Sequence, residues 1–194
     1  MKKAYSALFA LAAAVLLPGC AAVVLGGAAA GAGVAIDRRA PDTMATDQRI
    51  EWTAAQRIGQ KFGDNGHVNV TSFNKQVLLT GEAPTQALKQ DAESITAAVP
   101  DVRNVVNELT VGLPSGMESR SNDAYITSQV KARMVGQQKF NPLHVKVVTE
   151  AKVVYLMGLV SQKEATDATN IARGTKGVQK VVRVFEYIPA PPAR

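Results

Sequence analysis

The chain has 194 residues, a formal net charge of +6 at pH 7 and one cysteine. This length suits one ordinary domain or two small ones, and a single cysteine excludes an intrachain disulfide and a thiolate metal cluster. The sequence contains no P-loop, dinucleotide-binding fingerprint, nucleophile elbow or paired nucleophile and base, which argues against an enzyme.

The N-terminal residues have the pattern of a bacterial lipoprotein signal. Lys2 and Lys3 precede an apolar run over residues 4–17, which is too short to span a bilayer but suits the core of a signal peptide. The run ends in Leu17-Pro18-Gly19-Cys20, which resembles a lipobox. The resemblance implies removal of residues 1–19 and attachment of N-acyl (palmitate-type) and diacylglyceryl lipid to Cys20, with no other cofactor. It also implies sorting to the outer membrane, because residue 21 is Ala rather than Asp.

Residues 20–46 are predicted to form a tether. Residues 21–36 are rich in alanine and glycine, which favours a flexible segment over one that lies against lipid, and residues 37–46 continue as a polar linker.

The rest of the chain contains an internal repeat of two copies. His67-Val68-Asn69-Val70 returns as His144-Val145-Lys146-Val147, and Val77-Leu78-Leu79-Thr80-Gly81 returns as Val154-Tyr155-Leu156-Met157-Gly158. A repeat of this length is a small domain, and because one such core is marginal we expect the copies to pack on each other. The predicted division is a first copy over 47–112, a linker over 113–121, a second copy over 122–188 and a Pro-rich tail over 189–194.

Each copy has the pattern helix, strand, strand, helix, strand. This predicts an α+β fold in which a three-stranded sheet packs on two helices. Asp47 and Asn122-Asp123 are predicted N-caps of the first helices, and the hairpins are predicted to turn at Asn74-Lys75 and Ala151-Lys152. The predicted inner faces of the first helices are Ile50, Ala54, Arg57 and Ile58 in the first copy and Ile126, Val130, Arg133 and Met134 in the second.

The second helices are predicted over 85–98 and 161–173, and the closing strands over 102–111 and 178–188. Ser161 and Glu164 form a predicted capping box at the start of the later helix.

The order of elements, the glycine after the second strand and the Val102-x-x-Val105-Val106 pattern make each copy similar to a BON domain. The whole chain resembles the dual BON-domain outer-membrane lipoproteins, which include lipid-binding members associated with cell division and outer-membrane stress. The likeness is carried by Asp37-Arg38-Arg39, Asn69-Val70-Thr71, Ser121-Asn122-Asp123, Tyr125-Ile126-Thr127 and Leu156-Met157-Gly158-Leu159-Val160, among others.

The two copies differ in charge. The first carries six Lys and Arg against eight Asp and Glu, a net of −2, and the second carries ten against five, a net of +5. The asymmetry indicates that the second copy faces an anionic partner, with a merely soluble basic domain as the alternative.

The resemblance implies that the first helix of the second copy meets anionic phospholipid. Its outward strip is small and apolar with one aromatic at its start, whereas a solvated helix face is normally charged. Basic residues nearby would attract phosphatidylglycerol or cardiolipin, each contributing about 1 kcal/mol; Arg133 has an equivalent in Arg57, which suggests a structural role. The alternative is that Tyr125 and Val135 pack against the first copy. The predicted lipid-binding residues are Tyr125, Ser128, Lys131, Ala132, Val135, Gly136 and Lys139.

Four further residues are predicted to be structural. Gly81 and Gly158 end matching strands, which indicates close backbone approach or a bulge. His67 and His144 precede strands, and since no second His, Cys or paired carboxylate lies at ligand spacing, no metal site is predicted.

Two functions remain in competition. The first is a non-enzymatic periplasmic lipoprotein in the inner leaflet of the outer membrane, which docks on anionic phospholipid, supports envelope integrity and is placed at curved or dividing regions. The second is a periplasmic adaptor that assists outer-membrane protein assembly through the acidic copy or the helix face around Trp52. The export signal argues against a nucleic-acid partner.

Overall fold

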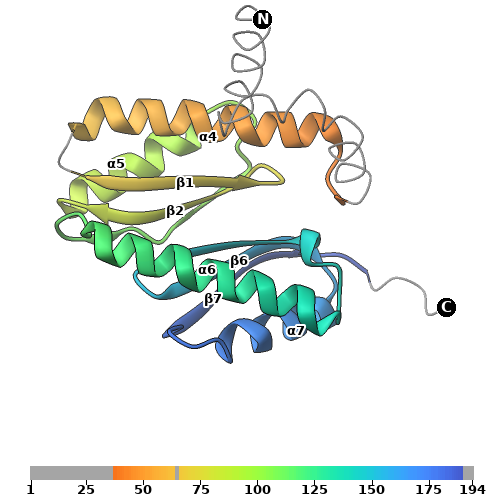
Figure 1. Ribbon diagram of the computed structural model, residues 1–194. Helices are drawn as coiled ribbons and strands as arrows, with labels where there is room; N and C mark the ends of the chain where they lie inside the picture. Colours follow the sequence, from red (N-terminus) through yellow and green to blue (C-terminus); the bar gives the residue numbers. More distant parts are fainter. Residues whose placement is uncertain (1–36, 64–65, 190–194) are drawn as a thin grey trace, which may run out of the picture. The chain divides into compact units, whose positions relative to one another are not determined.

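The computed structural model describes residues 37–63 and 66–189, so Cys20, the predicted signal peptide, most of the tether and nearly all of the tail lie outside it. Within these residues the predicted α+β order is confirmed in both copies (Figure 1). The first copy consists of α4 (Pro41–Phe62), β1 (His67–Phe73), β2 (Gln76–Ala83), α5 (Gln86–Ala97), β3 (Asn104–Asn107) and β4 (Thr110–Val111). The second consists of α6 (Met117–Gln137), the 3₁₀ turn η3 (Pro142–His144), β5 (Val145–Glu150), β6 (Val153–Val160), α7 (Gln162–Arg173) and β7 (Lys180–Tyr187).

Each sheet has the same topology. The first two strands form an antiparallel hairpin, and the closing strand returns through the second helix to lie parallel to the middle strand. In the second copy β7 pairs with β6 along eight residues, whereas the closing strand of the first copy is divided into β3 and β4, which both pair with β2. Leu109, at the break, is buried in the core of the first copy.

Both first helices begin earlier than the sequence predicts. Residues 41–46, predicted as tether, belong to α4, and residues 117–121, predicted as linker, belong to α6. Pro41 occupies the first turn of α4, where its missing N–H costs no hydrogen bond. The predicted N-caps are therefore wrong, because Ala40 and Gly116 hold those positions and Asp47 and Asp123 lie inside the helices.

The two aspartates cap hairpin turns instead. The buried carboxylate of Asp47 accepts hydrogen bonds from the backbone amides of Asn74 and Lys75, at 2.8 and 2.7 Å. Asp123 accepts from Ala151 and Lys152, both at 2.8 Å. All four turn residues have positive φ, between 48° and 65°, as two-residue hairpin turns require. The carboxylates thus compensate for a backbone conformation that non-glycine residues rarely adopt.

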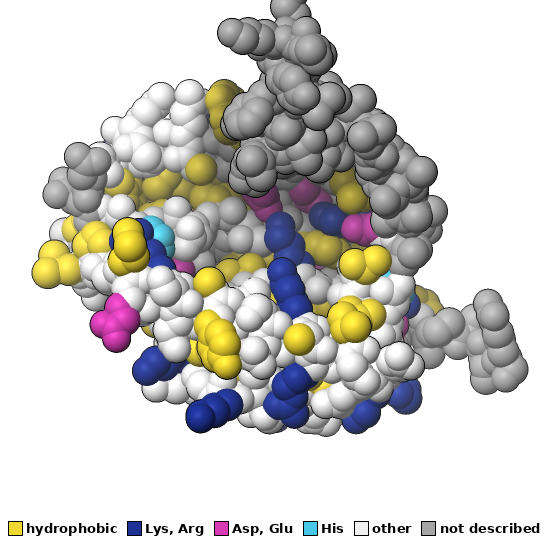
Figure 2. Space-filling model, viewed as in Figure 1, with side chains coloured by type: hydrophobic (Ala, Val, Ile, Leu, Met, Phe, Trp, Pro, Cys, Tyr) yellow, Lys and Arg dark blue, Asp and Glu magenta, His cyan; other side chains and the backbone are white. Residues whose placement is uncertain are grey.

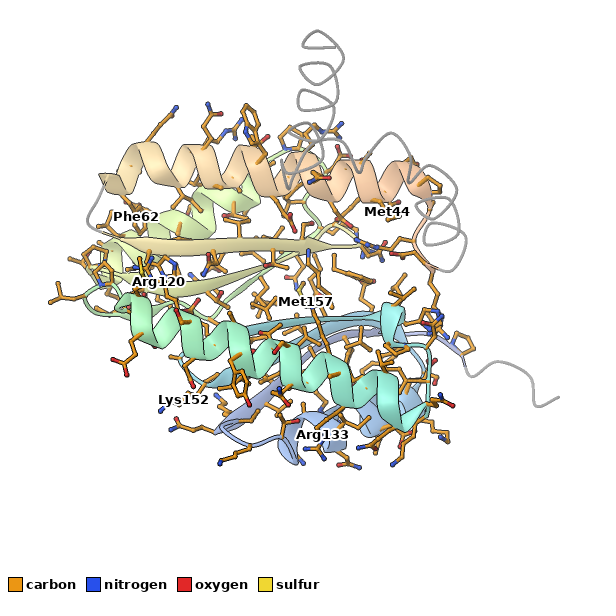
Figure 3. The ribbon with its side chains drawn as sticks, viewed as in Figure 1. Met44, Phe62, Arg120, Arg133, Lys152 and Met157 are labelled. Atoms are coloured by element: carbon orange, nitrogen blue, oxygen red, sulfur yellow. The ribbon has the colours of Figure 1, made fainter. Side chains whose placement is uncertain are left out.

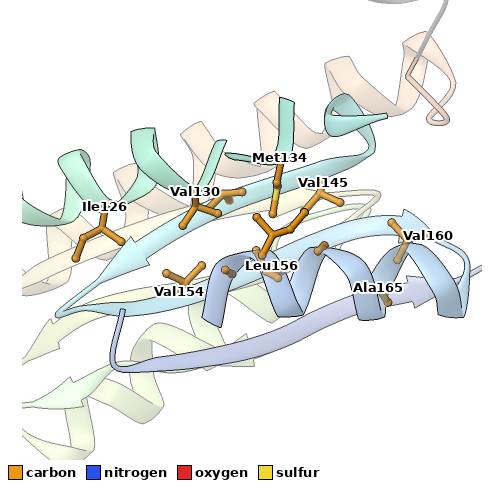
Figure 4. Packing of buried hydrophobic residues seen from close by; sticks show 12 residues of the cluster. Ile126, Val130, Met134, Val145, Val154, Leu156, Val160 and Ala165 are labelled. Carbon is orange, nitrogen blue, oxygen red and sulfur yellow. The ribbon is translucent and has the colours of Figure 1, made fainter. Parts of the chain in front are cut away.

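Each copy has a hydrophobic core of its own, which lies between its helices and its sheet. In the second copy Ile126, Val130 and Met134 of α6 pack with strand residues and with α7 (Figure 4), which confirms the predicted apolar face. Ile50, Ala54 and Ile58 occupy the same position in the first copy. Arg57 and Arg133 lie at the edge of this face, exposed and half-buried respectively, and are not core residues.

A third core joins the two copies. Phe73 and Leu78 of the first pack with Tyr155, Met157 and Val184 of the second, and Met157 is labelled in Figure 3. The middle strands β2 and β6 are therefore covered on both faces, which explains their nearly continuous apolar runs. The expectation that the copies pack on each other is confirmed.

Polar bonds also cross between the copies. Lys146 Nζ lies 2.8 Å from Glu51 Oε1, Asn69 Nδ2 donates to Glu150 Oε2 at 2.8 Å, and Arg103 Nη2 donates to Glu186 Oε1 at 2.6 Å. Directional bonds of this kind fix one register for two apolar faces that could otherwise slide.

Among the helices of the described residues, none combines the length and hydropathy needed to cross a membrane.

Candidate functional site

The outward strip of α6 is open to solvent. All seven predicted lipid-binding residues are exposed, and the two largest of the apolar ones, Tyr125 and Val135, each keep 60% of their surface accessible. This exposure excludes the alternative in which both side chains are buried against the first copy. The other members of the strip are Ser128, Ala132 and Gly136, Lys131 lies beside it, and Lys139 follows the end of the helix.

The charge of this surface has one sign. Residues 124–137 contain no acidic residue, Asp123 is buried at its turn, and Glu118 lies in the first turn of the helix. Over α6, Figure 2 shows hydrophobic side chains next to Lys and Arg. An apolar strip flanked by cations is typical of a helix that lies in a membrane interface.

Arg133 belongs to the scaffold rather than to this surface. Its guanidinium donates to the carbonyl oxygen of Gly174 and to Thr175 Oγ1, so that it holds the C-terminal end of α7 (Figure 3). Arg57 makes the equivalent bond in the first copy, to the carbonyl of Ala98 at the end of α5. Beside the strip, Lys131 of α6 and Lys139, just after the helix, are both exposed and can meet an anionic partner.

A groove of about 370 Å³ continues the strip at its C-terminal end. Val135 and Leu143 contribute apolar side chains, and Leu143 is 56% exposed. Lys131 lines the same groove. Leu143 is not predicted from the sequence, because this residue belongs to the turn η3 and only the fold returns it to the helix. The other lining residues are Arg39, Phe73, Met134, Pro142, Val145 and Lys146.

The equivalent face of the first copy is different. Trp52, at the position of Ser128, is 66% exposed beside a shallow cleft that Val68 and Val70 line. Arg49, at the position of Tyr125, is paired with Asp101 at 2.8 Å. This face therefore combines one exposed aromatic with balanced charges.

Gly81 and Gly158 lie where two strands approach closely. A Cβ at Gly81 would stand 2.0 Å from the carbonyl oxygen of His67, and one at Gly158 would stand 2.3 Å from that of His144. Gly81 also has φ +109°, a conformation that other residues rarely adopt. Close backbone approach accounts for glycine at both positions.

One set of potential metal ligands lies outside the α6 strip. His67, Glu82 and Glu150 offer ligand atoms that all lie within 4.8 Å of one another. His144, the repeat equivalent of His67, instead has Nδ1 3.6 Å from Glu164 Oε1. Residue spacing did not indicate the first set, because its members come from β1, β2 and β5.

The BON domain family matches this chain twice, over residues 51–112 and 122–189. The chain belongs to the BON-domain family. This BON protein is 36% identical to the outer membrane lipoprotein DolP of Haemophilus influenzae over 180 residues, which cover 92% of this chain and 93% of the relative. It is 30% identical to the 21 kDa hemolysin of Actinobacillus pleuropneumoniae over 155 residues, 79% of this chain and 80% of the relative. It is 31% identical to the osmotically-inducible protein Y of Escherichia coli over 117 residues, 59% of this chain and 58% of the relative. The predicted likeness to dual BON-domain outer-membrane lipoproteins is confirmed.

Proposed function

We propose that this BON protein is a non-enzymatic lipoprotein, anchored through Cys20 to the periplasmic face of the outer membrane, which docks α6 of its second copy on anionic phospholipid. The observation that carries the proposal is the exposed strip from Tyr125 to Val135, which has no acidic side chain and lies beside Lys131. The likeness to an outer membrane lipoprotein over nearly the whole chain supports the location.

Each residue of the strip contributes little to the free energy of lipid binding. Each lysine near an anionic surface contributes about 1 kcal/mol, and partial burial of a tyrosine and a valine adds about 1–2 kcal/mol each. Docking by α6 alone is therefore weak. The acyl chains on Cys20 would hold the protein at the bilayer, where a high effective concentration makes such weak docking sufficient. Because the lysine contribution arises only at a negatively charged surface, docking should be selective for anionic lipid. A role in envelope integrity and at curved or dividing regions is part of the same proposal.

The test uses protein that lacks residues 1–20, so that the acyl chains do not dominate binding. Phosphatidylglycerol micelles should shift backbone NMR signals of residues 124–137, whereas phosphatidylcholine micelles should not. Ala132→Glu should abolish the shifts, because it places a negative charge in the centre of the strip. Gln56→Glu, at the equivalent exposed position of α4, is the matched control and should leave binding unchanged. Equal binding by wild type and Ala132→Glu would show that α6 is not the docking surface.

The second candidate is an adaptor for outer-membrane protein assembly, and the observation that favours it is the exposed Trp52 beside its cleft. A photo-crosslinking residue at position 52 in intact envelopes should then capture one partner in stoichiometric yield, independent of lipid composition. A crosslinker at position 125 serves as the comparison. Lipid adducts at position 125 without a protein adduct at position 52 would favour phospholipid docking.

A further inference from the structure

His67, Glu82 and Glu150 form a compact group in which the two copies meet. His67 and Glu82 are directly paired residues of β1 and β2, and His67 Nδ1 lies 3.2 Å from Glu82 Oε2. Glu150 reaches the same place from the end of β5, in the other copy. The group therefore takes ligand atoms from both halves of the repeat.

The two carboxylates are poorly hydrated. Glu82 and Glu150 are each only 8% exposed. Glu82 contacts His67, and Glu150 accepts a hydrogen bond from Asn69 Nδ2 at 2.8 Å, so these two contacts bring no lysine or arginine to either carboxylate. Burial raises the pKa of Glu150, although Asn69 and His67 act in the opposite direction. A cation shared by two neighbouring buried carboxylates would offset both their burial and their mutual repulsion.

The surroundings leave room for a cation and its water ligands. A cavity of about 360 Å³ is lined by His67, Asn69 and Glu150. Arg120 lines the same cavity, but its guanidinium donates to the carbonyl of Ser115 at 2.8 and 3.1 Å. Figure 3 labels this arginine. The remaining lining residues are Asp123, Ala124, Thr127, Val147, Val148 and Thr149.

We propose that His67, Glu82 and Glu150 bind one divalent transition-metal ion of the zinc type, which links the two BON copies. One imidazole nitrogen and two carboxylate oxygens suit zinc, whose fourth position is filled by water in such three-ligand sites. Ligand atoms on one zinc ion lie about 3.3 Å apart. The ligand atoms now lie within 4.8 Å of one another, so the widest separation has to close by up to about 1.5 Å, a movement within reach of glutamate side-chain rotation.

The site has a structural consequence. The ion would add a link between the start of β1 and the end of β5, next to the bond from Asn69 to Glu150. A ligand that binds only the folded protein raises its stability in proportion to the logarithm of the ligand concentration. Zinc should thus stabilise the packing of the second copy on the first.

The first test is zinc titration of the full chain, untagged, in detergent. Calorimetry should give one ion per chain, and the unfolding temperature should rise with zinc concentration. Glu82→Gln and Glu150→Gln should each weaken zinc binding at least about tenfold, because each removes one charged ligand. The matched control is Glu51→Gln, which also removes a carboxylate that bonds across the copies, to Lys146, but lies outside the group. Its zinc affinity should equal that of the wild type.

A second measurement needs no substitution. The chain has only two histidines, so their ring-proton NMR signals can be followed separately. One equivalent of zinc should shift the signal of His67 and leave that of His144 in place. Absence of zinc binding at 100-fold molar excess, equal shifts at both histidines, or unchanged affinity in a folded Glu150→Gln variant would overturn the proposal.

Discussion

The guanidinium of Arg38 donates to both carboxylate oxygens of Glu164, at 2.8 and 2.9 Å. Arg38 also donates to the carbonyl of Leu159 at 2.7 Å, and Glu164 completes the capping box of α7 with Ser161. The segment that precedes α4 is thereby attached to the second copy. Burial of Glu164 by itself would raise its pKa, but the hydrogen bonds from Arg38 and Ser161 outweigh burial and lower the pKa to about 2.

The low pKa of Glu164 predicts an acid-dependent loss of stability. The folded-state pKa lies below the ordinary value of 4.5, so the stabilisation is complete above pH 4.5 and is lost as the pH falls toward 2. Arg38→Gln should lower the free energy of unfolding at pH 7 by about 1–3 kcal/mol, because it removes charge-assisted hydrogen bonds from a half-buried site. Urea unfolding at pH 7, 4 and 3 measures both effects, and the difference between variant and wild type should shrink with acid.

Lys163→Gln is the control for this pair. It removes an exposed bond to Asp167 on the same helix, 2.8 Å long, and should cost about 0.5 kcal/mol or less. An Arg38→Gln difference that stays constant from pH 7 to pH 3 would contradict the assignment.

The carboxylate that caps the second hairpin should be necessary for stability. Asp123→Ala removes the acceptor of two backbone amides, those of Ala151 and Lys152, and leaves their strained turn without compensation. We expect a loss of about 2–4 kcal/mol in urea unfolding. Ser121→Ala, an exposed change in the same helix, should be nearly neutral.

Because the backbone approaches closely at Gly81 and Gly158, replacing either glycine with alanine should destabilise the fold strongly. Gly158→Ala should cost about 3 kcal/mol, because its Cβ would overlap the carbonyl oxygen of His144. Gly81→Ala should cost more, since its positive φ adds backbone strain. Gly59→Ala, in open space on α4, should instead stabilise by about 0.5–1 kcal/mol. Thermal unfolding of the three variants decides the order, and equal effects would refute the steric explanation.

Lys131 should govern the electrostatic part of lipid docking. Lys131→Gln should weaken binding to phosphatidylglycerol vesicles about fivefold, equivalent to about 1 kcal/mol, and make binding less sensitive to salt. Lys163→Gln removes an exposed lysine from α7 and serves as the comparison. Vesicle flotation at 50 and 300 mM salt measures the difference, and an identical salt response in both variants would argue against contact at Lys131.

The amino-acid sequence was enough to predict the repeat, the order of elements, the apolar faces of α4 and α6 and the capping box at Ser161. These features depend on neighbours within one or two helical turns, and their periodicity is therefore visible along the chain. It also determined which face of α6 lacks charge, because that face follows from helical spacing alone.

Roles that depend on residues far apart in the chain became visible once the chain was folded. Asp47 and Asp123 resemble N-caps in sequence, yet each binds a turn that lies 27 to 29 residues further on. His67 and Glu150 are far apart in the chain and become neighbours because the two sheets pack on each other through the hydrophobic core between the copies. Local sequence patterns do not reveal such contacts, because the contacts depend on how two complete copies pack. That packing covers both faces of β2 and β6.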